Sequence, residues 1–572
     1  MKRLLALCAV VLFVLALAPG ALGAAGGKEK DTFVQLLAIN DFHGNLQPPT
    51  GSGGRIATGP GQTVDAGGVQ YLATWIKSLR TTNPNTITVG AGDLIGASPL
   101  ISGLFHDEPT IESMNALGLD VTGVGNHEFD EGVAELLRMQ FGDQLGGNGC
   151  HPVDGCQDGT PFGGALFQYL AANVFYEGTQ NTIFPPYEIR RVGNAKIAFI
   201  GLTLEGTPLI VTPAGVAGLE FRPEIGVINN LVASLRANEG VRAFVVLIHQ
   251  GGQQNAPFPL GYQDSDRCDN FTGDIIPIVN GLSPQVDVVV SAHTHQPYIC
   301  HINGKLVTSA ASFGRLITDI DLRIDHQTKD IESATAHNVI VTRNVASDAD
   351  QLAIINKYET LSGPIANRIV GSQTADMTRA TTPAGESALG DVIADAQLAS
   401  TSPADFGGAV VAFMNPGGIR QDLICTPPCT SGPSNVTYNQ LFTVQPFNNV
   451  MTVKTMTGDM IYRLLAQQFV VAPAPNFRIL QVSDGFTYSW SSNPTPHVID
   501  GSVAIDGVPV DKAASYRVAM NNFLASGGDG FTVFNEGTDP LGGEIDLDAL
   551  VNYFMHNSPV APGPQNRITR VP

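Results

Sequence analysis

Five hydrophobic runs of β-strand character in the first half of the chain each end at a polar residue. The runs cover residues 33–40, 86–92, 121–125, 243–248 and 286–292, and the polar residues that follow are Asp41, Asp93, Asn126, His249 and His293. Segments of helical spacing, such as 67–79 and 108–117, separate the first strands. Open α/β sheets place their sites at the carboxyl ends of strands, so these polar side chains are expected to meet. The pattern therefore predicts an α/β fold with one site.

The residue types at these strand ends are ligands that divalent metal ions prefer, with Zn, Mn, Co or Fe as candidates. Two ions about 3.5–4 Å apart need a ligand that touches both, and we predict Asp93 in that role. Asp41 and His43 are two residues apart, so an extended backbone would point both side chains the same way. The predicted ligands are Asp41, His43 and His295 for one ion, Asn126, His249 and His293 for the other, and Asp93 for both.

His127 lies beside a predicted ligand and is assigned a different task. It would protonate a leaving group or stabilise charge on a phosphoryl group in transfer. Asp130, three residues further on, would orient that imidazole and favour its charged form. A two-metal hydrolytic site with His127 and Asp130 as its catalytic pair is the leading hypothesis.

Length and charge limit the classes of protein that fit. With 572 residues the chain is too long for one core, so two or more domains are expected. The formal net charge of -21 argues against a stable nucleic-acid complex, because backbone binding needs a basic surface. A small anionic substrate remains compatible, since bound metal ions reverse the local sign of charge.

The first 24 residues have the form of a secretory signal peptide. Lys2 and Arg3 precede an apolar run from Leu4 to Ala18, and small residues lead to Ala24. The alternative is a membrane anchor, but the run is shorter than the roughly 20 residues that a span needs. We therefore expect a cleaved signal, no transmembrane anchor, and a secreted or periplasmic location.

Six cysteines follow the predicted signal, an even number that suggests disulfides in an exported chain. Proximity along the chain favours the pairs 150–156, 268–300 and 425–429. A zinc-binding knot is the alternative, and pairing cannot be deduced from the sequence alone.

The pattern changes near residue 346, where a polar helical segment (346–369) is expected to connect a first domain (32–345) to a second one (370–572). The second half has its own strand pattern at 407–415 and a glycine-rich loop at 526–531.

The motifs DFHG, GDLIGASPL, GNHEFD, LIHQGG and AHTH resemble those of the calcineurin-like metallophosphatase superfamily. Residues 379–396, NPGGIR (415–420), QPFNN (445–449) and NNFLASGGDGF (521–531) resemble the C-terminal domain of the 5′-nucleotidase family, which includes bacterial UDP-sugar hydrolases. The resemblance implies an α/β (α+β) protein. Its N-terminal metallophosphoesterase β-sandwich would be flanked by helices, and a connecting helix would act as a hinge to a C-terminal α/β nucleotide-binding domain.

The resemblance also implies roles for residues of the second half. Arg420 would pair with the phosphate, Asn415 would contact the base, and Asp529 would accept the ribose hydroxyls. Phe447 and Phe523 would sandwich the base. Asn449 belongs to the same substrate-binding set, and Arg379 would be a second phosphate-binding arginine, although the spacing before Glu386 departs from the family pattern.

We therefore expect a dinuclear-metal enzyme that hydrolyses nucleoside 5′-monophosphates to nucleoside and phosphate. UDP-sugars and nucleoside di- and triphosphates are open as further substrates. The enzymatic alternative is a 2′,3′-cyclic-nucleotide 2′-phosphodiesterase with 3′-nucleotidase activity. The alternative from another class is an inactive nucleoside-binding protein, against which the complete set of motif residues argues.

Overall fold

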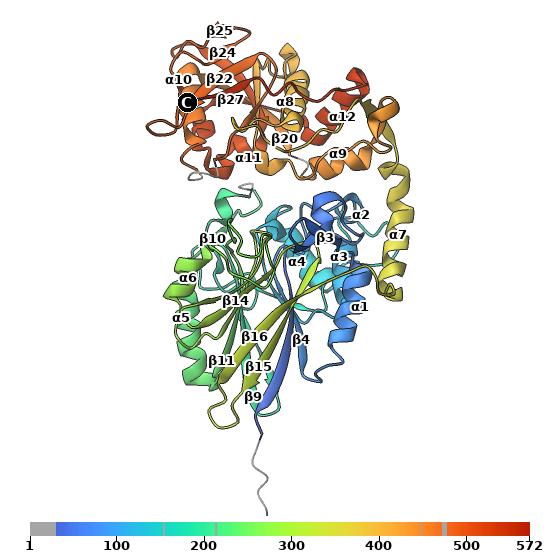
Figure 1. The fold of residues 1–572 in the computed structure, drawn as a ribbon, viewed down its shortest axis with the longest axis vertical. Coiled ribbons are helices and arrows are strands. Elements are labelled where there is room, and N and C mark those ends of the chain that lie inside the picture. Colours follow the sequence, from blue (N-terminus) through green and yellow to red (C-terminus); the bar gives the residue numbers. More distant parts are fainter. Residues whose placement is uncertain (1–29, 153–154, 212–213, 448, 472–476) are drawn as a thin grey trace, which may run out of the picture.

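A computed structural model describes residues 30–572, apart from 153–154, 212–213, 448 and 472–476. The predicted signal peptide, residues 1–24, lies outside the described residues. The chain forms two domains, with a long helix, α7 (Ala349–Ala366), running along one side between them (Figure 1). The predicted α/β architecture is confirmed.

Two six-stranded sheets form the centre of the N-terminal domain. The first has the order β16 (Ile331–Ile340), β15 (Leu316–Ile324), β1 (Thr32–Ile39), β4 (Thr86–Ala91), β5 (Val121–Gly123), β6 (Gln168–Leu170). The second has the order β13 (Pro297–Ile302), β14 (Lys305–Ala310), β12 (Val288–Ser291), β11 (Ala243–His249), β9 (Ala195–Thr203), β8 (Tyr187–Val192). Both are mixed sheets: the first has antiparallel strands, β15 and β16, on one side of its parallel strands, and the second has an antiparallel strand at each edge.

The alternation of side chains along the strands explains why two sheets stack. On β1, Leu36 and Ala38 point into a core shared with the second sheet, whereas Leu37 and Ile39 face the helices. On β11, Leu247 points into the same shared core. Central strands that are apolar on both faces need a layer on each side, so a helix–sheet–sheet–helix arrangement satisfies them.

Helices cover the two outer faces. The first sheet is covered by α1 (Val69–Leu79), α3 (Glu108–Leu117) and α4 (Val133–Phe141), and the second by α5 (Glu224–Ser234) and α6 (Ile275–Gly281). The short helix α2 (Leu100–Gly103) lies at the top of the domain in Figure 1, facing the second domain. Two small ribbons, β2 (Arg55–Gly59) with β3 (Gln62–Asp65) and β7 (Val174–Tyr176) with β10 (Leu219–Phe221), complete the domain.

Helix α7 is fixed to the N-terminal domain by polar contacts as well as packing. The side chain of Asp348 caps its first turn by accepting the amide of Gln351 at 3.2 Å. Gln351 in turn donates to the carbonyl of Ser113 in α3 at 2.9 Å. Pro364 lies inside the last turn of the helix, where it lacks the amide that would continue the helical hydrogen bonds, just before the second domain begins.

The C-terminal domain contains two five-stranded sheets, of which the larger has the longer strands. The larger has the order β21 (Gln481–Val482), β18 (Val411–Met414), β26 (Ser515–Asn521), β20 (Val450–Thr457), β27 (Thr538–Ile545). The smaller contains β23 (His497–Val498), β22 (Phe486–Ser491), β24 (Ala504–Ile505), β25 (Val508–Pro509) and, beside β22, β28 (Ile568–Val571). The pair β17 (Ile369–Gln373) and β19 (Ser434–Thr437) and the helices α8 (Ala388–Thr401), α9 (Tyr438–Val444), α10 (Gly458–Gln467), α11 (Asn522–Ala525) and α12 (Asp546–Asn557) surround them.

The two domains also touch directly. Leu100 and Leu104, at α2, share a hydrophobic cluster with Leu441 and Phe442 of α9.

All three predicted disulfides are present, as Cys150–Cys156, Cys268–Cys300 and Cys425–Cys429. Among the helices of the described residues, none combines the length and hydrophobicity needed to cross a bilayer.

Candidate active site

The predicted ligands converge where the carboxyl ends of both sheets meet. Asp41, Asp93 and Asn126 follow strands of the first sheet, and His249 and His293 end or follow strands of the second. His249 is the last residue of β11 itself rather than the residue after it. The amide of His293 donates to the Asp41 carboxylate at 3.0 Å, which links the two sheets at the site.

The backbone at the predicted ligands is left-handed, which corrects one expectation. The φ angles of Asp41 and His43 are 48° and 47°, so an extended backbone is not what brings these two side chains together. Asp93, His293 and His295 also have positive φ, at 51°, 71° and 57°. Such conformations cost non-glycine residues energy, and they persist where the surroundings impose them, as at many functional sites.

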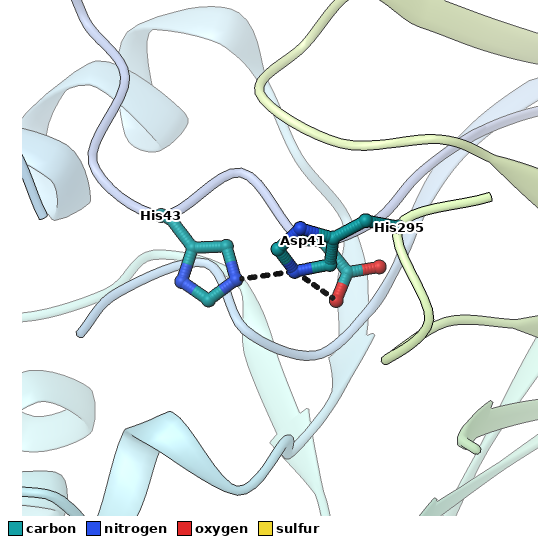
Figure 2. A group of neighbouring side chains, drawn as sticks. All are labelled: Asp41, His43 and His295. Atoms are coloured by element: carbon teal, nitrogen blue, oxygen red, sulfur yellow. Dashed lines mark hydrogen bonds and ion pairs between the residues drawn. The ribbon is translucent and has the colours of Figure 1, made fainter. Parts of the chain in front are cut away.

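One group of ligand atoms belongs to Asp41, His43 and His295, which Figure 2 shows together. The Nε2 atoms of His43 and His295 lie 3.0 Å apart, and His295 Nε2 lies 3.5 Å from Asp41 Oδ1. The other ring nitrogen of His43, Nδ1, contacts the carbonyl of Gly96 at 2.8 Å. A carbonyl accepts a hydrogen bond, so His43 carries its proton on Nδ1 and turns the lone pair of Nε2 toward its neighbours.

The second group contains Asp93, His249 and His293. His249 Nε2 lies 3.0 Å from Asp93 Oδ2 and 3.1 Å from the side-chain oxygen of Asn126. Its Nδ1 contacts the carbonyl of Ala91 at 2.9 Å. Asp93 Oδ2 is also 3.6 Å from His43 Nε2, so this carboxylate lies between the two groups.

These contacts fit a cation. Around His249, an imidazole lone pair, a carboxylate oxygen and an amide oxygen face one another in a buried place, and all three are electron donors. Burial disfavours the charged imidazole, yet the Asp93 carboxylate outweighs burial and raises the pKa of His249 to about 9. The site therefore attracts positive charge, and the mixed Asp, Asn and His donors suit borderline divalent ions.

His127 is held against this centre by two contacts. Its amide donates to Asp93 Oδ1 at 2.9 Å, and its Nδ1 lies 2.8 Å from Asp130 Oδ2. Burial lowers the pKa of His127, but the charges of Asp130 and Asp93 outweigh burial and raise it above the ordinary value. His127 also shares a group of possible ligand atoms with His43 and Asp93.

Glu128 is a structural member of the site that we did not single out from the sequence. Its buried carboxylate accepts the amides of Asp93 at 2.9 Å, Leu94 at 2.8 Å and Gly125 at 2.6 Å. These bonds fix the loops that follow β4 and β5 relative to each other. The sequence feature that could have identified Glu128 is its position inside the metal-ligand motif Gly125–Asp130.

A cavity of about 190 Å³ joins the candidate metal centre to the C-terminal domain. We call it the interdomain cavity. Its lining residues are Asn126, His127, Asp130, Ile210, Val211 and His293 from the first domain, and Asn415, Gly417, Gly418, Arg420, Phe447, Asn449, Arg478, Asn521, Phe523 and Asp529 from the second. Six of the seven predicted substrate-binding residues thus line one space.

Two phenylalanines and an arginine of the second domain shape this cavity. The ring of Phe447 stacks on that of His127, with centroids 5.6 Å apart and planes inclined by 15°. The guanidinium carbon of Arg420 lies 5.5 Å from the centre of the Phe447 ring. Phe523 packs over Gly528, where an added Cβ would lie 2.6 Å from the ring, so the glycine-rich loop leaves the space that this ring fills.

A chain of hydrogen bonds orients the polar end of the cavity. Asp529 accepts Arg478 at 2.7 Å on one oxygen and Asn415 at 2.9 Å on the other. Asn521 donates to the Asn415 side-chain oxygen at 3.1 Å. Sequence reasoning missed Arg478, which lies outside every recognised motif, and it assigned no role to Asn521 although the motif 521–531 begins there.

Arg379 is the one predicted substrate-binding residue that does not line the interdomain cavity. It borders a neighbouring, wider cavity of about 740 Å³, together with Arg420 and His295. Its Nε lies 3.3 Å from Asp422 Oδ1, and its side chain is 42% exposed. The structure therefore separates Arg379 from the cavity that Phe447 and Phe523 line.

Comparison with known proteins identifies the class of the chain. Residues 34–297 match the calcineurin-like phosphoesterase family, and residues 364–536 match the 5′-nucleotidase C-terminal domain. The chain combines these two domains and belongs to the 5′-nucleotidase family, as the resemblance of its motifs predicted.

Individual relatives cover nearly the whole chain. This chain is 32% identical over 557 residues to "Endonuclease YhcR" of Bacillus subtilis, and the alignment covers 95% of this chain and 42% of that protein. The chain is 31% identical over 552 residues to "Cell wall protein Lmo0130" of Listeria monocytogenes, and the alignment covers 91% of this chain and 67% of that protein. The chain thus spans less than half the length of the first relative. The fold is similar to that of a 5′-nucleotidase precursor from Thermus thermophilus, with a TM-score of 0.72, 24% identity and coverage of 94% and 99%.

Proposed function

We propose that this protein is an exported two-metal 5′-nucleotidase, which hydrolyses nucleoside 5′-monophosphates to nucleoside and phosphate. The observation that carries the proposal is the interdomain cavity. One continuous space has His127 and His293 of the candidate metal centre on one side and two phenylalanine rings, Arg420 and Asp529 on the other. A nucleotide needs such partners together: metal ions and an arginine for its phosphate, a carboxylate for its ribose hydroxyls and aromatic faces for its base.

The candidate ligands for the two ions are Asp41, His43, Asp93, Asn126, His249, His293 and His295. Two divalent ions held there would supply Lewis-acid polarisation of the phosphoryl group and a water of lowered pKa. Asp93 is proposed as the shared ligand because its Oδ2 lies near both His249 and His43.

His127 is proposed to donate a proton to the departing ribose oxygen or to stabilise charge on the phosphoryl group in transfer. Asp130 supports both tasks, because its carboxylate holds Nδ1 of His127 at 2.8 Å and favours the charged imidazole. The ring of Phe447 covers one side of His127, which excludes water from that face of the acid.

The C-terminal residues are proposed to select the nucleoside. Arg420 supplies the forked donor that suits phosphate oxygens. Phe447 and Phe523 offer aromatic faces to the base, a contact that tolerates any base. Asp529, which Asn415 and Arg478 hold in place, would accept the ribose hydroxyls. The segment around Pro364 is proposed as the hinge through which the second domain delivers substrate to the metals.

A substrate panel tests the proposal. Purified protein supplied with Mn²⁺, Co²⁺ or Zn²⁺ should release phosphate from AMP with the highest kcat/KM, and chelation should abolish the release. 3′-AMP and 2′,3′-cyclic AMP should be poor substrates, and UDP-glucose shows whether the specificity extends to nucleotide sugars. A preference for 3′-AMP or the cyclic nucleotide would replace the proposal with the phosphodiesterase alternative. Tight AMP binding without turnover would replace it with a nucleoside-binding protein.

A polynucleotide belongs in the same panel, because one relative carries the name endonuclease. We propose that this chain does not cleave long nucleic acids, since its net charge of -21 opposes binding of a polyanion. Cleavage of single-stranded DNA at a rate similar to AMP hydrolysis would contradict that part of the proposal.

A further inference from the structure

Two histidines and a glutamate form a cluster that the proposed reaction does not use. One ligand atom from each of His106, Glu131 and His151 lies within 4.8 Å of the others. The Nδ1 of His106 is 2.6 Å from Glu131 Oε2, and the rings of His106 and His151 stack with centroids 3.5 Å apart. We propose that these three side chains bind an additional divalent transition-metal ion, with Zn²⁺ the best suited.

The types of ligand in the cluster determine which metal ion it favours. Two imidazoles and one carboxylate, with water as a fourth ligand, are a known zinc coordination set. Imidazole donors also suit Zn²⁺ better than Mn²⁺, which prefers oxygen ligands. Ligands about 2.0 Å from a tetrahedral zinc ion lie roughly 3.3 Å from one another. To bind one ion, the stacked rings of His106 and His151 must swing apart until one nitrogen of each points at it. The side chain of Glu131, 46% exposed, has room to turn toward the same ion.

The segments that carry the three ligands are held in place independently of a metal. His106 lies in the turn between α2 and α3 with a φ of 51°. The buried carboxylate of Glu108 accepts the amides of His151 at 3.3 Å and Cys156 at 2.8 Å, and Arg138 contacts it at 2.6 Å. A disulfide closes the loop that contains His151. The backbone at His106 and the amide of His151 are thus fixed without a metal ion, which lowers the entropy cost of binding one.

A second cluster in the domain shows what distinguishes this one. Asp31, Asp325 and His326 also gather within 4.8 Å, but Arg323 already occupies Asp31 through a 3.0 Å contact. At the first cluster, the ion-pair partner of Glu131 is His106, itself a candidate ligand. A metal ion there would replace the ion pair between His106 and Glu131 with coordinate bonds to both. It would tie the α2–α3 turn, the disulfide loop and the segment after Asp130 to each other.

Metal counting tests the site without relying on catalysis. In an Asp93→Ala protein, which lacks the proposed shared ligand, Zn²⁺ titration followed by metal analysis should find one tight equivalent. Adding His151→Ala should remove that equivalent. Zn²⁺ should raise the Tm of the single variant by about 2–5 °C and leave that of the double variant unchanged, because only an ion that binds the native state stabilises it.

The wild-type background supplies the controls. His151→Ala and Glu131→Gln should each lose one zinc equivalent and keep AMP hydrolysis in saturating Mn²⁺. His301→Ala, at an exposed histidine of β13, should lose none. Equal zinc content in wild type and both cluster variants would overturn the additional site. Circular dichroism of each variant confirms that a lost ion is not a lost fold. Failure of AMP hydrolysis in wild type would overturn the proposed function and leave this zinc count interpretable.

Discussion

Five of the seven candidate metal ligands adopt a left-handed backbone, and the surrounding contacts impose it. Asp41 donates its amide to Gly92 at 3.1 Å, and His43 donates to Asp93 at 3.0 Å. Glu128 holds the amide of Asp93 itself. Each such residue costs on the order of 1 kcal/mol or more, so these buried bonds are what stabilise a geometry that isolated loops would not keep.

Replacing Asp93 tests the shared-ligand assignment. Asp93→Ala should reduce the content of both catalytic ions and lower kcat/KM by more than about 100-fold, because even partners one step removed from a metal cost 10–100-fold. Metal analysis and AMP hydrolysis measure the two effects. Asp143→Ala, an exposed acid of the same domain, is the matched control and should change neither. Retention of two tightly bound ions in Asp93→Ala would assign the shared role to another residue.

His127 separates chemistry from metal binding. His127→Ala should lower kcat roughly 10²–10⁴-fold, the usual contribution of a positioned acid, while the metal content stays normal. Asp130→Asn should cost less, since an amide can still accept from Nδ1 but no longer favours the charged ring. Because His127 also lies near His43 and Asp93, metal content is the decisive measurement. If His127→Ala lost bound metal, His127 would be a metal ligand.

At the scale of elements, a carboxylate joins two strands of the second sheet. Asp287, just before β12, accepts the amide of Phe244 in β11 at 3.1 Å. Burial raises the pKa of Asp287 to about 7. The folded state therefore keeps a proton that the unfolded state releases near pH 4. This contribution to stability is complete below pH 4 and is lost as the pH rises toward 7.

Asp287→Asn should remove that dependence. The amide oxygen still accepts from Phe244, and no charge has to be buried above pH 7. The Tm of the variant should exceed that of wild type by a few degrees at pH 8, equivalent to about 1–2 kcal/mol, and match it at pH 4. Calorimetry at both pH values measures the difference. An equal Tm shift at both would indicate a packing effect instead of a titration.

At the scale of the whole molecule, the interdomain cavity depends on how two domains face each other. Phe447 follows α9 and Phe523 lies in α11, and both border a space that His127 closes from the other domain. Phe447 also stacks on His127, so its loss would disturb both the base slot and the catalytic group. Phe523 contacts the slot without touching His127 in this way, and it is the cleaner probe of nucleoside recognition.

Phe523→Ala should raise KM for AMP about 5- to 150-fold, because losing one stacking face costs roughly 1–3 kcal/mol. Ribose 5-phosphate keeps the sugar and the phosphate but lacks the base, so its kinetics should barely change. Phe447→Ala should raise KM for AMP similarly and also lower kcat on both substrates. If Phe523→Ala raised KM equally for AMP and for ribose 5-phosphate, that ring would belong to the core, and the case for a nucleotidase would be weaker.

The sequence alone determined the features that are local. Continuous hydrophobic runs located β1, β4 and β11 to within about two residues, because such a run is a short-range property of the sequence. The sequence also located the candidate metal ligands, because their residue types indicate metal binding and each follows the end of a predicted strand. Cysteine pairs four, six and 32 residues apart were also accessible, since short loops make near neighbours the natural partners.

Only the tertiary structure decided what depends on packing between distant segments. The left-handed backbone of Asp41 and His43 is imposed by loops after other strands, so an extended geometry was the wrong inference from their spacing. Arg478 reaches the cavity through Asp529, 51 residues away, and Arg379 is kept outside it by Asp422. No local pattern contains these contacts, because they form only once distant segments of one domain have packed, and packing energy is shared among residues that the sequence does not place together.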